Sequence, residues 1–147
     1  MMGWVRLTKV FSADQFARGL AGWDWIGLAG KAPVVASLFA DVFCESSTGW
    51  WFLDTIEGTL RRCWATPAAL DADLATTAGA ERYLLGSVAV KASARGIALG
   101  PHEVFGFVPP PIVRGRLDID SIQPVDFVAA LNIAGQIHRQ IRQAPVG

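Results

Sequence analysis

Two short, aromatic-rich apolar stretches lie near the middle of the chain, at 50–54 and 59–64, between turns that carry Gly, Asp and Glu. Short apolar and aromatic runs bounded by turn residues predict β-strands, in which successive side chains point to opposite faces. A strand-like stretch at 41–45 precedes them, and tight turns at 46–49 and 55–58 join the three. We therefore predict an antiparallel meander. The residues expected on its buried sides are Val42, Cys44, Trp51, Leu53, Leu60 and Trp64.

Helix starts are indicated by capping residues and prolines. Ser12 to Gln15 forms a capping-box pattern and predicts a short helix that runs to Leu20. Pro33 suits a first helical turn and predicts a second short helix to about residue 39. Thr66, followed by proline, predicts the next helix start. A further helix is expected from about 78 to 95, with Gly96 as a left-handed cap.

The clearest helical pattern lies near the end of the chain. Pro124 is expected to open this helix, and Asp126 complements the positive end of the helix dipole. The apolar stripe at helical spacing consists of Phe127, Leu131, Ala134, His138 and Ile141. Within the stripe, His138 is expected to make one hydrogen bond.

Two further strands complete the prediction, one at 4–10 and one at 103–108, which ends before three consecutive prolines. Trp23 and Trp25 are expected half-buried at the edge of the core, because each indole N–H needs a partner. The sum is an α+β fold, a mostly antiparallel sheet packed against several helices, including a long C-terminal one. At 147 residues we expect a single domain, 1–147.

Composition narrows the class of protein. Hydrophobic residues make up 52% and charged residues 18%, as expected of a globular chain. Thirteen basic and thirteen acidic residues cancel, which argues against direct binding to nucleic acid. The longest apolar run, 32–39, is too short to span a membrane, and the N-terminus has no signal-peptide pattern, so we expect a cytoplasmic protein. Cys44 and Cys63 are expected on strands one and three of the meander, too far apart for a disulfide.

Residues suited to catalysis are sparse. The chain has two histidines, and no nucleotide-binding, zinc-binding or nucleophile motif occurs, so we expect no enzyme activity, no metal and no cofactor. One enzymatic alternative needs Asp118, Asp120 and His102 to converge in one cleft. More commonly an Asp-Ile-Asp pattern caps a helix.

Without catalytic motifs, we expect a binding function, and two tryptophans of the predicted strands are candidates for contact with a partner. Trp50 and Trp51 are adjacent and face opposite sides, so one is a candidate anchor for a partner, unless the C-terminal helix covers it. Acidic and basic residues in turns and in the segment before the last helix are further candidates. The partner-binding candidates are Trp50, Asp54, Glu57, Arg114, Arg116, Asp118 and Asp120.

Several segments, in order, resemble one known family over about residues 33–142. They are Gly-Trp-Trp-Phe-Leu-Asp at 49–54 with Ile-Glu-Gly at 56–58, Tyr-Leu-Leu-Gly at 83–86, Arg-Gly at 95–96, Gly-Pro-His-Glu-Val-Phe-Gly-Phe at 100–107, Pro-Pro at 109–110, Gly115, and Asn-Ile-Ala-Gly-Gln-Ile-His at 132–138. This pattern is similar to the C-terminal domain of type VI secretion DNase-immunity proteins, formerly a domain of unknown function. Fuller members carry an additional N-terminal domain, and about 30 residues precede the match here.

The resemblance implies that the protein binds a cognate secreted toxin, such as a nuclease, and occludes its active site without catalysis. It assigns no binding residues. The alternative from the sequence is a module that binds a small ligand in a pocket between the sheet and the C-terminal helix, lined by the tryptophans.

Overall fold

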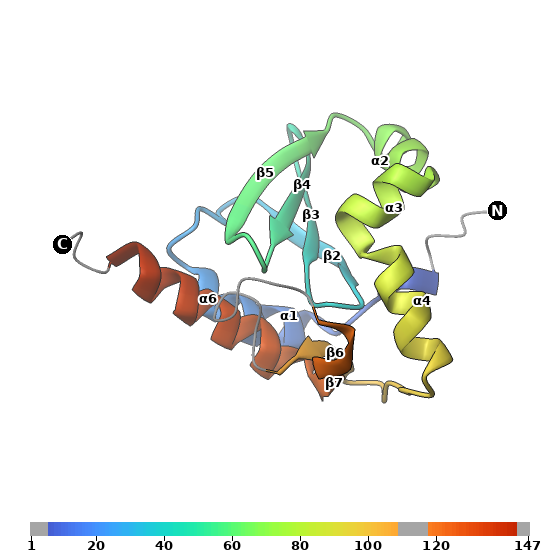
Figure 1. The fold of residues 1–147 in the computed structure, drawn as a ribbon. Helices are drawn as coiled ribbons and strands as arrows, with labels where there is room; N and C mark the ends of the chain where they lie inside the picture. The colour runs from blue at the N-terminus through green and yellow to red at the C-terminus, as the bar shows by residue number, and fades with distance from the viewer. Residues whose placement is uncertain (1–5, 109–117, 144–147) are drawn as a thin grey trace.

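The computed structural model describes residues 6–108 and 118–143. Its main sheet is an antiparallel five-stranded meander in chain order, with β4 and β5 as the predicted aromatic strands (Figure 1). The bounds are β1 Thr8–Lys9, β2 Ala32–Ser37, β3 Val42–Ser46, β4 Gly49–Asp54 and β5 Thr59–Trp64. A separate two-stranded antiparallel sheet pairs β6, Glu103–Phe107, with β7, Ile122–Asp126.

Helices surround both sheets. They are α1 Ala13–Leu20, α2 Pro67–Leu74, α3 Thr77–Leu84, α4 Gly86–Ala94 and α6 Phe127–Gln143, with 3₁₀ turns η2 Ala21–Trp23 and η3 Ile119–Ser121. The predicted α+β class, with a long C-terminal helix, is confirmed. No helix among the described residues is long and apolar enough to cross a membrane.

The meander is covered on both faces. Val42, Cys44 and Leu53 belong to a core shared with α1, η2 and α6. Phe43 and Phe52 belong to a second core, shared with α2 and α3. In Figure 1 the green and yellow helices α2 to α4 stand to one side of the sheet, and the red helix α6 runs beneath it. A third cluster joins α4 to the β6–β7 pair.

Helix α6 packs closely on the N-terminal segment. The buried Trp23 indole donates to the carbonyl of Leu131, 2.8 Å away. Gly22 and Gly135 lie so near each other that a Cβ on either would overlap backbone atoms of the opposite segment. The close packing of α6 against the N-terminal segment therefore requires glycine, which has no side chain, at both positions. Trp23 is fully buried, not half-buried as expected, whereas Trp25 is half-buried and donates to Gly22 and Gly135.

The predicted helix at Pro33 is wrong, because this segment is strand β2. Its pairing with β3 stabilises the extended conformation, whereas an isolated helix of this length is only marginally stable in water. Pro33, which has no N–H to donate, lies where the β2–β3 register shifts. The predicted first strand at 4–10 is much shorter than expected within the described residues, spanning only Thr8–Lys9.

The start of the last helix also differs. Pro124 lies within β7, opposite Phe105, and α6 begins at Phe127. Both strands of a two-stranded sheet are edges, so a residue without an N–H is tolerated there. Asp126 acts at the helix start as predicted, since its Oδ2 accepts the N–H of Ala129 at 2.9 Å.

The helix expected over 78–95 is two helices, α3 and α4, divided at Leu85. Leu85 has φ of +49°, a left-handed conformation that a continuous helix cannot contain. Its side chain packs at the edge of the third cluster, which compensates the strain. Gly96, with φ of +83°, follows α4 as predicted.

The buried sides of the meander were predicted correctly, except for one change of face. Trp50 pairs with Trp64, but Trp51 pairs with Arg62, so β5 contains one extra residue, Cys63. This β-bulge turns Trp64 to the opposite face from Leu60. Cys44 and Cys63 are free thiols, on strands separated by β4.

Candidate functional site

The turn between β4 and β5, residues 55–58, is anchored by three side chains from two parts of the chain, the β2–β3 connection and α6. Asp41 Oδ1 accepts hydrogen bonds from both the N–H and the hydroxyl of Thr55, each at 2.8 Å. His138 Nε2 lies 2.8 Å from the Thr55 carbonyl oxygen. Arg142 Nη2 donates to the carbonyl of Gly58, also at 2.8 Å. The turn therefore has a fixed position relative to α6.

Gly58 closes this turn with φ of +73°, a conformation that favours glycine. A Cβ there would overlap the His138 ring. Asp54 Oδ1 accepts the N–H groups of Ile56 and Glu57, both at 3.0 Å. Hydrogen bonds within the turn and from outside it therefore both fix its backbone conformation.

Asp41 is a buried carboxylate without a positively charged partner among the described residues. Burial raises its pKa to about 7, and the nearby charge of Asp54 adds to the rise. Hydrogen bonds from Thr55 and Ser37 act in the opposite direction, because they stabilise the ionised form. Asp41 joins the β2–β3 connection to the β4–β5 turn, so its ionisation bears on how the turn is held.

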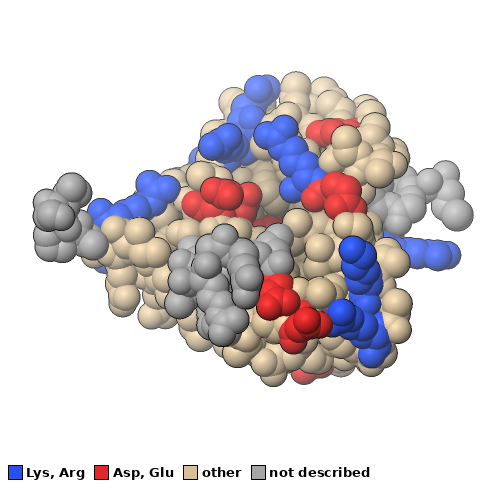
Figure 2. Space-filling view, viewed as in Figure 1, with Lys and Arg blue, Asp and Glu red and all other residues tan. Residues whose placement is uncertain are grey.

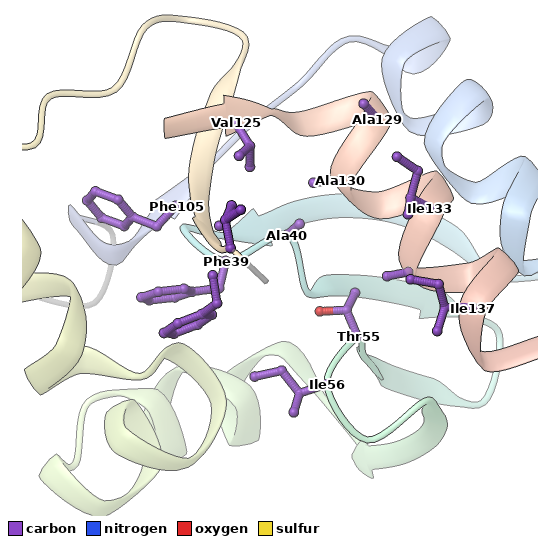
Figure 3. A pocket seen from close by; sticks show the side chains of 14 residues that line it. Phe39, Ala40, Thr55, Ile56, Phe105, Val125, Ala129, Ala130, Ile133 and Ile137 are labelled. Carbon is purple, nitrogen blue, oxygen red and sulfur yellow. The ribbon is translucent and has the colours of Figure 1, made fainter. Parts of the chain in front are cut away.

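An apolar cavity of about 330 Å³ lies on one side of the turn, between α6, the β6–β7 pair and the loop at 39–40 (Figure 3). Figure 3 shows Ile133 and Ile137 on α6, across from Phe39 and Phe105. Thr55 is the one polar side chain in the described lining. The described lining residues are Phe39, Ala40, Thr55, Ile56, Phe105, Gly106, Phe107, Val108, Val125, Ala129, Ala130, Ile133, Ala134 and Ile137.

A second concavity of about 270 Å³ lies on the other side of the turn, between β4–β5 and α3. We call it the charged groove, because two carboxylates and two guanidinium groups line it beside aromatic rings. Its described lining residues are Phe52, Asp54, Glu57, Thr59, Arg61, Cys63, Arg82 and Tyr83. Burial raises the pKa of the Cys63 thiol, which disfavours a reactive thiolate.

Two predicted site residues, Asp54 and Glu57, meet in the charged groove. Asp118 and Asp120 lie at η3, where Asp118 Oδ1 accepts the Asp120 N–H at 3.0 Å, the capping arrangement expected from the sequence. Asp120 also forms an ion pair with Arg95, the residue that follows α4. The candidates Arg114 and Arg116 lie outside the described residues.

The candidate anchor Trp50 is buried. It is 8% exposed and belongs to the core beneath α2 and α3. The helix that covers it is therefore not the C-terminal one. Trp51 is the more accessible of the pair. Its indole donates to Ser46 Oγ at 2.9 Å, and Lys31 Nζ lies 4.3 Å from its ring centroid.

The residues of the enzymatic alternative have different neighbours. His102 Nδ1 lies 2.9 Å from the side-chain nitrogen Nε2 of Gln15, whereas Asp120 contacts Arg95. Asp118 caps η3. None of the described cavities is lined by two of these three residues. No group of three or more His, Cys, Asp or Glu side chains that could hold a metal ion occurs among the described residues.

Sequence reasoning missed Arg61, Arg82 and Tyr83 in the groove, and the isoleucines of the cavity. The alternation of β5 could have placed Arg61 beside Thr59, because both precede the bulge and share a face. Nothing in the sequence could have placed Arg82, since its position depends on how α3 packs on the sheet. The ligand-binding alternative expected tryptophans in the lining, and none occurs among the described lining residues of the cavity next to α6.

In comparisons with known proteins, no family model matches the chain and no curated protein matches it.

Proposed function

We propose that this protein binds a partner protein through the surface around the β4–β5 turn, and that it acts as an immunity protein that occludes a secreted toxin, such as a nuclease, in the cytoplasm. The observation that carries the proposal is the position of the turn. It is locked by Asp41, His138 and Arg142, and it separates an apolar cavity from a charged groove. Stable interfaces combine an apolar core with a polar rim in this way.

Two exposed apolar side chains support the choice of this surface as the one that binds the partner. Ile133 is 52% exposed on α6 and Val108 is 48% exposed at the end of β6, and both line the apolar cavity. A large apolar side chain of a partner would fill this cavity and bury both residues, as an interface anchor does. The resemblance of segments within 33–142 to DNase-immunity proteins directs the proposal toward a toxin.

The experiment is capture of partners from the source cells with the tagged chain, followed by expression of the captured protein alone and together with this chain. We expect one stoichiometric partner that arrests growth alone and is harmless when co-expressed. Ile133→Asp should abolish both capture and protection, whereas Val10→Asp, at a valine 76% exposed elsewhere, should change neither. A captured protein that is harmless by itself would contradict the immunity role.

Binding of a small apolar ligand is the second candidate function, favoured by the volume of the cavity, which lies at the lower end of the range for ligand pockets. The described lining offers no set of convergent polar groups to orient a ligand. Thermal-shift screening distinguishes the two candidates, because a ligand of the cavity would raise the melting temperature of the wild type and not of Ile133→Asp.

A further inference from the structure

The charged groove holds charges that do not pair with one another. Asp54 and Glu57 lie near its turn end, and Arg61 and Arg82 line it as well. Among the residues that the structure describes, ion pairs join only Arg18 to Asp14, Arg95 to Asp120 and Arg139 to Asp24. The four charges of the groove are therefore available to a partner.

Strand register arranges these charges along the groove. Asp54 pairs with Thr59 next to the turn, and Phe52 pairs with Arg61 two residues further along the same face. Two residues of a strand span about 7 Å, so the backbone positions of Thr59, beside Asp54, and Arg61 are about that far apart along β5. Arg82 lies over the Tyr83 ring, with its guanidinium carbon 5.2 Å from the ring centroid, and adds to the basic end.

The floor of the groove is apolar, and an apolar floor strengthens the electrostatic interactions that the charges above it can make. Phe52 and Tyr83 are buried and pack edge to face, with ring centroids 5.1 Å apart. A segment that covers this floor excludes water from the groove, so that its ion pairs act at a lower local dielectric than on an open surface. Figure 2 shows this side of the molecule with basic and acidic groups interspersed, rather than one field of a single sign.

The groove is lined in part by β5, a strand at the edge of the main sheet. β5 is the last strand of the meander, and β4 is its only pairing neighbour in the described part of the chain. An extended peptide segment can lie along such an edge, with alternate side chains directed to the same side. Positions i and i+2 of such a segment are about 7 Å apart along its backbone, which matches the spacing of positions 59 and 61 of β5.

We propose that the charged groove receives an extended segment of the partner protein that carries one basic and one acidic side chain two residues apart. The basic side chain contacts Asp54 and Glu57, and the acidic one contacts Arg61 and Arg82. This inference rests on the proposed function, because it names the part of the partner that the same surface recognises.

The test uses short capped peptides and the full chain labelled with ¹⁵N. Three peptides of equal length differ only in one triplet: Lys-Val-Glu, Lys-Val-Lys or Glu-Val-Glu. We expect Lys-Val-Glu to shift the amide signals of Thr59, Arg61 and Arg82 and to bind more tightly than either like-charged peptide. Glu57→Lys and Arg82→Glu should each weaken binding roughly twofold to fivefold, the range of exposed ion pairs.

Glu45→Lys is the matched control, because Glu45 is an exposed acid outside the groove. The amide spectrum of each variant also reports whether it is folded. Equal binding of all three peptides, no binding of Lys-Val-Glu, or signal shifts confined to other surfaces would overturn the inference. Partner capture that is lost in Ile133→Asp but unchanged in both groove variants would overturn it as well, while leaving the proposed function intact.

Discussion

At the scale of single residues, Asp41 makes the free energy of unfolding depend on pH. Its pKa is raised to about 7 from an ordinary 3.8, so the folded protein holds this proton more tightly than the unfolded chain. The stabilisation from Asp41 is therefore fully present below about pH 4 and is lost as pH rises through 7. The cause is burial of a carboxylate that has no positively charged partner among the described residues, together with the nearby charge of Asp54.

We expect the free energy of unfolding to decline between pH 4 and 7, at a slope from Asp41 of up to about 1.4 kcal/mol per pH unit. Urea unfolding at a series of pH values measures this slope. Asp41→Asn should flatten it, and Asp54→Asn should move the decline to lower pH, because the charge of Asp54 helps raise the pKa of Asp41. An identical slope in Asp41→Asn and wild type would show that other groups cause the decline.

At the scale of elements, helix α6 is placed by the close approach of Gly135 to Gly22. Gly→Ala within a helix ordinarily stabilises it, because alanine has the higher helix propensity. Here the added methyl group would overlap the Gly22 carbonyl and the Trp23 ring. The sign of the change in stability therefore reports whether packing or propensity dominates.

We expect Gly135→Ala to lower the free energy of unfolding by about 1–3 kcal/mol, the usual cost of overpacking. Chemical denaturation followed by circular dichroism measures it. Gln140→Ala, at an exposed position of the same helix, should remain within about 0.5 kcal/mol of wild type. A Gly135→Ala protein as stable as the wild type would mean that α6 can move away from η2 at little cost.

At the scale of the whole molecule, the three hydrophobic clusters are connected. Leu7 packs against both the second and the third cluster, and β3 and β4 contribute side chains to the first and the second. A strand with one face in each core cannot unfold from one core alone. We therefore infer that the chain, predicted as a single domain, loses its described cores together.

Thermal unfolding should then show one transition, with the same midpoint by tryptophan fluorescence and by far-ultraviolet circular dichroism. Trp23 reports the first cluster and Trp64 the second. Trp23→Phe and Trp64→Phe each remove one of the six tryptophans, so the difference from the wild-type signal gives the contribution of that tryptophan. Fluorescence transitions of these variants that differ in width or number from the circular dichroism transition would indicate independent units.

Local sequence signals located β3, β4 and β5, the capping box at Ser12, the start of α2 and the body of α6, because each depends on neighbouring residues alone. The errors at Pro33 and Pro124 have one cause. Proline fits a first helical turn and also fits a strand edge or an irregular register, and only pairing with a distant strand decides between them.

By itself, the sequence determined the α+β class, the aromatic meander and the candidates Asp54 and Glu57, since these follow from alternation, caps and turns within a few residues. Tertiary structure alone decided that Trp50 is buried, that Arg61 and Arg82 share a groove with those acids, and that α6 borders an apolar cavity. The physical reason is that burial and proximity between distant segments depend on how helices pack on a sheet, which no local pattern encodes.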